Sequence, residues 1–206
     1  MGDTKHEAED RTTVTTVGAK QVVFTYSEPV SGFDAPPTFE GPGVIPVIAF
    51  NGSGERLDTP DAAYFSRDDT GGEAWSIVGW INLTGSGERT FWSKWETTGL
   101  AREWVVSFLP DQKAEFKLRD ESQKTQPNRQ SDVSYTENVW NHFAATYDGS
   151  GGVFAMDGVT LYRNGVVIAS TATNRESYVG MENDTAVVEI GSQDGGPPFF
   201  DGKMAG

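Results

Sequence analysis

One group of acidic side chains lies in the stretch "ENDTAVVE", which contains Glu182, Asp184 and Glu189. Hydrolysis of a glycosidic bond with retention needs two carboxylates on one face, about 5–5.5 Å apart. Side chains on one face of a strand recur at every second residue, and Glu189 differs in parity from Glu182 and Asp184. The stretch therefore does not bring all three acids to one face and fails the Glu-x-Asp-x-x-Glu pattern, and we interpret it as a solvated loop that leads into a strand.

Other nucleophiles and bases are scarce. The sequence has two histidines, His6 and His142, and no cysteine. His6 lies in a polar N-terminal stretch, and His142 lies in a strand pattern, where a single histidine is typically packed or half-exposed. No serine stands in a Gly-x-Ser-x-Gly motif, and without cysteine there is no thiolate nucleophile. We predict that the protein is not an enzyme.

The pentapeptide "GSGER" occurs at residues 52–56 and again at 85–89. A glycine-rich loop can hold a phosphate when it continues into Gly-Lys-Ser/Thr and a helix. Neither copy does so, and we predict two turns.

The chain has a formal net charge of −14 over 206 residues. Nucleic-acid binding depends on Lys and Arg that neutralise phosphates, so we expect no nucleic-acid partner. No run approaches the roughly 20 apolar residues that span a bilayer, so we expect no membrane insertion, and no signal peptide is visible. Surplus carboxylates suit calcium, which takes oxygen ligands, and they equally serve solubility.

Short β-branched and aromatic runs, separated by Gly, Asn and Asp turns, predict an all-β protein. Residues 1–45 form a predicted N-terminal extension, with a hairpin in 12–26 and a Pro/Gly-rich linker in 27–45. From residue 46 the pattern is that of one domain. Its predicted strands include 74–83, 89–95, 103–109, 114–120, 140–148, 159–163, 166–170 and 186–192. This spacing is typical of a two-sheet antiparallel β-sandwich or jelly roll.

The stretch "VTLYRNGVVIAS" at 159–170 is the clearest single element. Asn164 and Gly165 both tolerate the positive φ of a type I′ turn, whose twist matches two antiparallel strands. We predict a tight hairpin.

Several segments in order resemble the laminin-G-like, concanavalin A-like domains: "AFNGSGERLDTPD", "WSIVGWINL", "FWSKWE", "WNHFAATYDGS", the hairpin above, and "VEIGSQDGGPPFFDGKMAG". The resemblance covers about residues 46–206 and implies a concanavalin A-like jelly roll. In the family a closing strand follows the Phe-x-Gly-Lys motif, whereas this sequence ends at Gly206. We expect the closing strand to be missing, either because the sequence is a fragment or because strands in 12–26 cover the edge.

Pentraxins, calcium-dependent members of the same superfamily, resemble the chain at "GSQDGGPPFFDGK". The resemblance implies a calcium site that includes Gln193, Asp194 and Asp201. Where pentraxins supply Asp-Asn from a second loop, this chain has Ala101-Arg102, and Glu96 is the candidate substitute. The alternative is a Gly/Asp turn that only ends a strand.

Exposed aromatic rings are candidates for stacking on sugars. Trp95 ends a predicted strand before the polar loop "ETTGLARE", and Phe199 follows the Asp194 loop, so we predict both as carbohydrate-binding residues. Trp80, Trp140, Phe143 and Phe200 are predicted to lie in the core.

These observations predict a non-catalytic, lectin-like module that binds a glycan or glycoprotein. The alternatives are a structural or adhesive module of a larger assembly, such as a phage virion or tail protein, and a glycan-cleaving enzyme. The expected location is extracellular or virion-associated, with other chains of an assembly as further partners.

Overall fold

The structure, a computed structural model, describes residues 15–16, 22–23, 47–66 and 74–206. The chain divides into two compact units, Met1–Ala35 and Pro36–Gly206. In the first unit β1 (Thr15–Thr16) pairs antiparallel with β2 (Val22–Val23), both within the stretch 12–26. The predicted linker at 27–45 lies outside the described residues.

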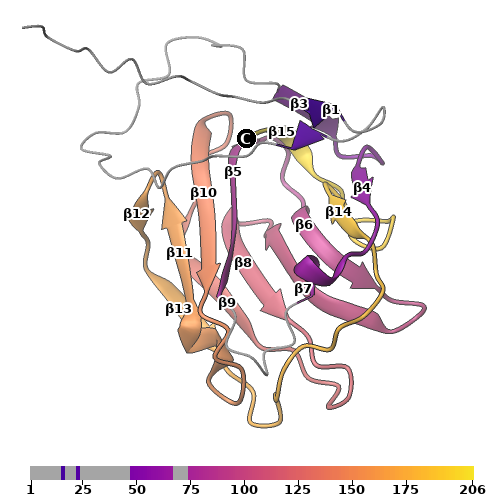
Figure 1. The fold of residues 1–206 in the computed structure, drawn as a ribbon. Helices are drawn as coiled ribbons and strands as arrows, with labels where there is room; N and C mark the ends of the chain where they lie inside the picture. The colour runs from indigo at the N-terminus through magenta and orange to yellow at the C-terminus, as the bar shows by residue number, and fades with distance from the viewer. Residues whose placement is uncertain (1–14, 17–21, 24–46, 67–73) are drawn as a thin grey trace, which may run out of the picture. The chain divides into compact units, whose positions relative to one another are not determined.

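The second unit is a sandwich of two antiparallel sheets (Figure 1). One sheet has six strands in the order β12, β11, β10, β5, β15, β3. These strands are β3 (Val47–Asn51), β5 (Trp75–Leu83), β10 (Trp140–Tyr147), β11 (Val159–Arg163), β12 (Val166–Val167) and β15 (Asp201–Ala205). The predicted all-β sandwich is therefore confirmed.

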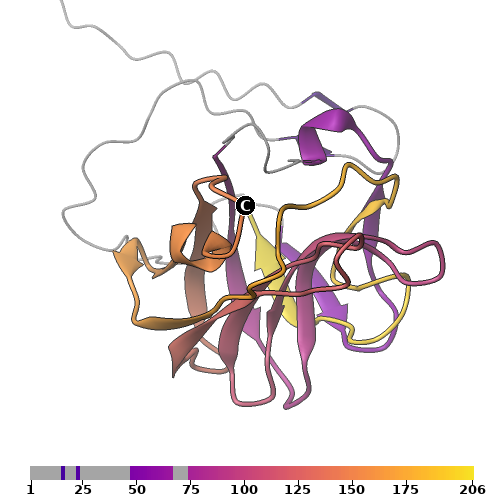
Figure 2. The same cartoon turned by 90° about the horizontal axis from the view of Figure 1, so that it is seen from below.

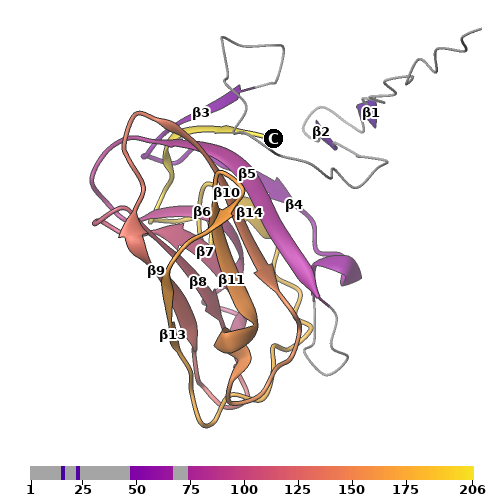
Figure 3. The ribbon, with the colours of Figure 1, turned by 90° about the vertical axis from the view of Figure 1, so that its left-hand side faces the viewer.

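The other sheet has seven strands in the order β13, β9, β8, β7, β6, β14, β4. They are β4 (Leu57–Thr59), β6 (Arg89–Glu96), β7 (Ala101–Phe108), β8 (Lys113–Leu118), β9 (Asn128–Ser134), β13 (Ser170–Thr173) and β14 (Val188–Ile190). Figure 3 shows β5, β10 and β11 in one layer and β6 to β9 in the other. Two 3-10 turns, η1 (Ala63–Phe65) and η2 (Ala155–Gly158), complete the unit, and none of its described helical segments is long and apolar enough to cross a membrane.

Aromatic rings from both sheets meet in the core. Phe143 of β10 lies 5.6 Å from Phe91 of β6 and 5.5 Å from Phe108 of β7, measured between ring centroids. Edge-to-face pairs of this kind stabilise a core beyond the area they bury. Phe143 and Phe200 are fully buried, as predicted.

Two tryptophans differ from the prediction. Trp80 and Trp140 are half-buried and lie on the outer face of the six-stranded sheet, because Ile81, Leu83 and Phe143 take the alternate, core-facing positions of β5 and β10. Their apolar strands did not reveal which parity faces inward.

The hairpin at 159–170 forms with Asn164 at φ 52° and Gly165 at φ 77°, as predicted. Its second arm, however, divides after Val167. β12 stays with β11, whereas β13, from Ser170, pairs with β9 in the opposite sheet. The chain thus changes sheets within the predicted arm.

The sequence analysis missed β9 because its core-facing positions are polar. Ser131 accepts a hydrogen bond from the Ala114 amide, and Arg129 donates to the Met156 carbonyl. These side chains satisfy backbone groups of neighbouring segments where an apolar residue would otherwise pack.

The closing strand was expected to be missing, but the motif Phe-x-Gly-Lys itself runs into β15. This strand pairs with β3 along Val47–Asn51 and with β5 along Trp80–Leu83. β15 therefore lies between β3 and β5 in the six-stranded sheet.

Candidate functional site

The side of the seven-stranded sheet that faces away from the core carries mostly polar side chains, several of which, such as Ser93, Ser107 and Glu189, are buried. Trp104, Val106 and Phe108 of β7 face the core, so the alternate residues of each strand face outward. One outward row runs through Asp58, Glu189, Ser93, Val105, Lys117, Asn128 and Thr173, and the next through Ser107, Glu115, Gln130 and Thr171. We call these two rows the polar face.

A lysine lies between two carboxylates at the centre of the polar face. The Lys117 ammonium is 2.6 Å from Glu115 Oε2 and 3.7 Å from Glu88 Oε1. Asn128 donates to Glu115 Oε1 at 2.6 Å, and Ser107 donates to Glu88 Oε1 at 3.3 Å. Carboxylate, amide and hydroxyl groups therefore occur together in a hydrogen-bonded arrangement.

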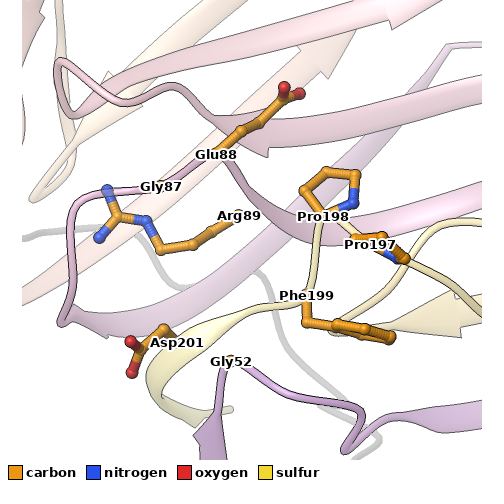
Figure 4. A pocket seen from close by; sticks show the side chains of 8 residues that line it. All are labelled: Gly52, Gly87, Glu88, Arg89, Pro197, Pro198, Phe199 and Asp201. Carbon is orange, nitrogen blue, oxygen red and sulfur yellow. The ribbon is translucent and has the colours of Figure 1, made fainter.

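A pocket of about 360 Å³ opens beside the polar face (Figure 4). We call it the rim pocket. It is lined by Gly52, Gly87, Glu88, Arg89, Pro197, Pro198, Phe199 and Asp201. Figure 4 shows Phe199 and the two prolines at one end, Arg89 and Asp201 at the other, and Glu88 pointing away from Asp201. Because Glu88 also contacts Ser107 and Lys117, the rim pocket and the polar face are continuous.

The two GSGER turns hold Asp201 between them. Gly52 and Gly85 have φ of 73° and 69°, and a Cβ on either would lie within 3.1 Å of the Asp201 side chain. Thr84 donates its hydroxyl to Asp201 Oδ1 at 2.6 Å. The glycines are thus needed both for the turns and for the close approach of this carboxylate.

Both turns carry the chain from the six-stranded to the seven-stranded sheet, one from β3 to β4 and the other from β5 to β6. The segment 191–200 returns it from β14 to β15. The rim pocket therefore lies where three crossings between the sheets come together.

Arg89 forms a buried wall of the rim pocket, with 1% of its surface exposed. Its guanidinium donates to the carbonyls of Thr84 and Gly85, each at 2.6 Å, and to the Gln112 side chain. Burial lowers the pKa of this guanidinium, against the opposing effect of the Glu137 and Asp201 carboxylates. Arg89 thus fixes the β5–β6 turn.

The connection 174–187, gold in Figure 2, is attached by acidic side chains. Asp120 accepts from the Val179 amide at 3.0 Å, and Glu182 accepts from the Glu121 and Ser122 amides at 2.9 and 2.8 Å. The Asp184 amide donates to Glu103 at 2.8 Å. The stretch "ENDTAVVE" does lead into β14, as predicted. Its residues Glu182 and Asp184 are nevertheless hydrogen-bonded to other segments, so the interpretation as a solvated loop is wrong for these two residues. Glu189 is also buried, and it accepts from the Ser192 hydroxyl and the Gly195 amide.

Lys94 and Glu103 form a fully buried ion pair beneath this connection. The Lys94 ammonium also donates to the Asp184 carbonyl and lies 3.1 Å from Asp61 Oδ1. Glu103 Oε1 accepts from Lys94, Ser66 and the Asp184 amide, whereas Oε2 has no hydrogen-bond partner in the described part of the chain. Desolvation raises the pKa of Glu103 to about 7, although Lys94 and the other donors act to lower it.

The raised pKa of Glu103 predicts pH-dependent stability. The folded protein retains this proton up to about pH 7, whereas the unfolded chain loses it near the ordinary value of 4.5. The associated stabilisation is complete below pH 4.5 and is lost as the pH rises to about 7. Urea titrations at pH 5 and pH 8 should show a loss on the order of 2 kcal/mol that Glu103→Gln removes. Glu176→Gln, at an exposed acid, should keep it, and an unchanged pH slope in Glu103→Gln would contradict the assignment.

The residues predicted to bind calcium occupy two places. Asp194 Oδ2 accepts from the Thr97 amide at 3.1 Å, next to Glu96, whose carboxylate lies against Gly99. Gln193 is in the same turn as Asp194, bridged to Gly196. Asp201 instead lies beside Gly85, and the eight residues of β6, at about 3.3 Å each, separate the two contacts.

Asp201 thus does not join Asp194. Among the described residues, no three His, Cys, Asp or Glu side chains form a group placed to hold a metal ion. Calcium binding near Asp194 stays a prediction.

Of the two aromatic residues predicted to bind carbohydrate, one is buried and the other lines the rim pocket. Trp95 is only 6% exposed, and the Arg102 guanidinium lies 5.6 Å above its ring, so the prediction of an exposed platform is wrong. Phe199 is half-buried and lines the rim pocket together with Asp201. His142 is half-buried, as predicted, with its ring 5.3 Å from that of Trp80, and burial lowers its pKa.

Sequence reasoning missed the polar face and the role of Glu88. The signal was present in "AEFKLRD", where Glu115 and Lys117 alternate with the buried Ala114, Phe116 and Leu118. Such alternation places both polar residues on one outward face.

The fold is that of a two-sheet antiparallel β-sandwich with a pocket at one rim. A family model for the concanavalin A-like lectin/glucanases superfamily, of the laminin G type, matches residues 51–206. The chain therefore belongs to this superfamily. No curated protein sequence matches it.

The chain is also similar, at low identity, to several solved structures. The carbohydrate-binding module CBM40 of the Ruminococcus gnavus IT-sialidase, bound to alpha2,3 sialyllactose, is 17% identical, with a TM-score of 0.49 over 65% of this chain and 74% of that one. The SAP-like pentraxin of Limulus polyphemus is 14% identical, with a TM-score of 0.45 over 63% and 60%. The leech intramolecular trans-sialidase is 14% identical, with a TM-score of 0.46 over 77% of this chain and 24% of that one.

Proposed function

We propose that this domain is a non-catalytic, lectin-like module that binds a glycan or glycoprotein through the rim pocket. The observation that carries the proposal is the combination of a half-buried Phe199 ring with the fixed Asp201 carboxylate in one pocket. Sugar rings present an apolar face and several hydroxyl donors. An aromatic side chain and a small number of placed polar groups are suited to these two features.

The placement of the other carboxylates supports binding without turnover. Glu182 and Glu189 accept hydrogen bonds from amides of their surroundings, and Glu115 is paired with Lys117 and Asn128. Each of these acids has a structural partner. The proposal includes an extracellular or virion-associated location, because a module that binds glycans or glycoproteins meets them at surfaces.

The test is glycan binding by the full chain and by Phe199→Ala. Loss of the ring should weaken binding about tenfold, which corresponds to about 1.4 kcal/mol. The matched control is Phe154→Ala, since Phe154 is 67% exposed and does not line the pocket. Measurements with calcium and with a chelator also test the Asp194 prediction. Equal affinities of Phe199→Ala and the unaltered chain would contradict the proposed site.

One observation favours a second candidate, an adhesive or structural module of a larger assembly. Val47, Val78 and Val167 are 47%, 55% and 60% exposed on the outer face of the six-stranded sheet, where Trp80 and Tyr162 are half-buried. Exposed apolar surface of this kind is typical of contacts between chains. A folded protein that binds no glycan would favour this role.

A further inference from the structure

We infer that the rim pocket selects neutral or amino sugars and rejects sugars that carry a carboxylate, such as sialic and uronic acids. This inference rests on the proposed function and specifies the ligand class of the same site. It follows from which charged groups of the pocket a ligand can reach.

The acidic groups are accessible. The Glu88 side chain is 37% exposed where the rim pocket meets the polar face, and Asp201 is half-buried inside the pocket. Thr84 bonds to Asp201 Oδ1, while Oδ2 has no hydrogen bond from any described residue. Oδ2, which lies against Gly52 and Gly85, is the acceptor that remains for a sugar hydroxyl or ammonium.

The cations of the pocket wall and of the polar face are not accessible, and Lys203, exposed two residues along β15 from Asp201, lies outside the pocket lining. Arg89 is 1% exposed, and both of its terminal nitrogens donate to the protein. Its Nε has no partner among the described residues, but this atom is buried and a ligand cannot reach it. Lys117 lies between Glu115 and Glu88, and Lys113 is 3.2 Å from Asp111.

A sugar carboxylate in the rim pocket would thus lie against the Asp201 carboxylate, with no accessible cation among the residues that line the pocket. Like charges brought together at an interface are strongly unfavourable, and such repulsion is a common source of specificity. An ammonium on the sugar would instead make a charge-assisted hydrogen bond with Asp201. The chain's net charge of −14 acts in the same direction at long range.

The rigidity of Asp201 strengthens this discrimination. Gly52 and Gly85 enclose its carboxylate closely, and the Thr84 hydroxyl fixes its orientation. The carboxylate therefore cannot turn away from an acidic ligand without losing this bond. A preorganised acceptor favours the correct ligand and excludes the wrong one.

The experiment is an array of oligosaccharides in matched pairs, probed with the full chain. Each neutral oligosaccharide is present with and without a terminal sialic or uronic acid, and N-acetylglucosamine oligomers are present with and without their acetyl groups. We expect the acidic member of each pair to bind at least tenfold more weakly, and the deacetylated oligomers to bind at least as tightly as the acetylated ones.

Asp201→Asn, which removes the charge and keeps the shape, should reduce the neutral-to-acidic ratio several-fold. Glu176→Gln removes one exposed acid outside the pocket lining and should leave the ratio unchanged. Acidic glycans that bind as tightly as their neutral partners would overturn this inference alone. Silence of a folded protein across the whole array would overturn the proposed function, and this inference with it.

Discussion

Replacing Lys94 with methionine is expected to lower the free energy of unfolding by about 3–5 kcal/mol at pH 8, above the pKa of Glu103, because the buried carboxyl group is ionised there and loses its counterion. Lys94 and Glu103 are both fully buried. The ammonium also binds the Asp184 carbonyl and the Asp61 carboxylate. Its loss therefore removes contacts to three segments, those of Asp61, Glu103 and Asp184. Urea unfolding followed by tryptophan fluorescence measures the effect.

Two further variants separate charge from shape. Lys203→Met, at an exposed lysine of β15, should change stability by no more than about 0.5 kcal/mol. Adding Glu103→Gln to Lys94→Met should recover part of the loss, because the remaining side chain is then neutral. A double variant that loses the sum of both single effects would show that the pair is not coupled.

Replacing Gly202 with alanine is expected to cost about 3 kcal/mol or more, since backbone strain and steric overlap add. Gly202 has φ 142° and pairs with Phe50 and Leu83 in the sheet. A Cβ there would lie 2.2 Å from the carbonyl oxygen of Asn82 and 3.1 Å from the Phe200 ring. The glycine of the Phe-x-Gly-Lys motif is therefore required by space as well as by φ.

Gly54 is the matched control for this prediction. Its φ is 141°, but a Cβ on it would meet nothing within 4 Å. Gly54→Ala should thus show the strain alone, on the order of 1 kcal/mol. The difference in thermal stability between the Gly202→Ala and Gly54→Ala variants measures the cost of the steric overlap. Equal losses of stability would mean that β15 shifts to accommodate the methyl group.

The sandwich could be predicted because alternation and turn residues are local signals. Asn164-Gly165 set their hairpin, and the buried positions of β8 alternate with polar ones. Whether a tryptophan in a strand is exposed depends on which face of its sheet packs against the other sheet. The sequence of the strand itself does not specify that contact. Trp95 and Trp80 were misplaced for that reason.

The residues of the rim pocket could not be grouped from the sequence. Phe199 and Asp201 are predicted as parts of two different sites, one for carbohydrate and one for calcium, whereas both line one pocket in the structure. Arg89 and Glu88 come from another part of the chain, and the turn that holds them contacts Asp201 only in the folded protein. Asp194 and Asp201 are close in sequence but lie against opposite ends of β6, which spacing alone does not reveal.

The three crossings at the rim pocket also have a mechanical meaning. Val47 and Ala205 pair across β3 and β15, so tension applied at these two ends first separates the two strands. A ligand in the rim pocket contacts residues of all three crossings, Gly52, Gly87 and Phe199, and Gly52 lies in the turn that follows β3. A bound ligand should therefore connect the β3 end of the unit to the two other crossings and raise the force needed to pull it away.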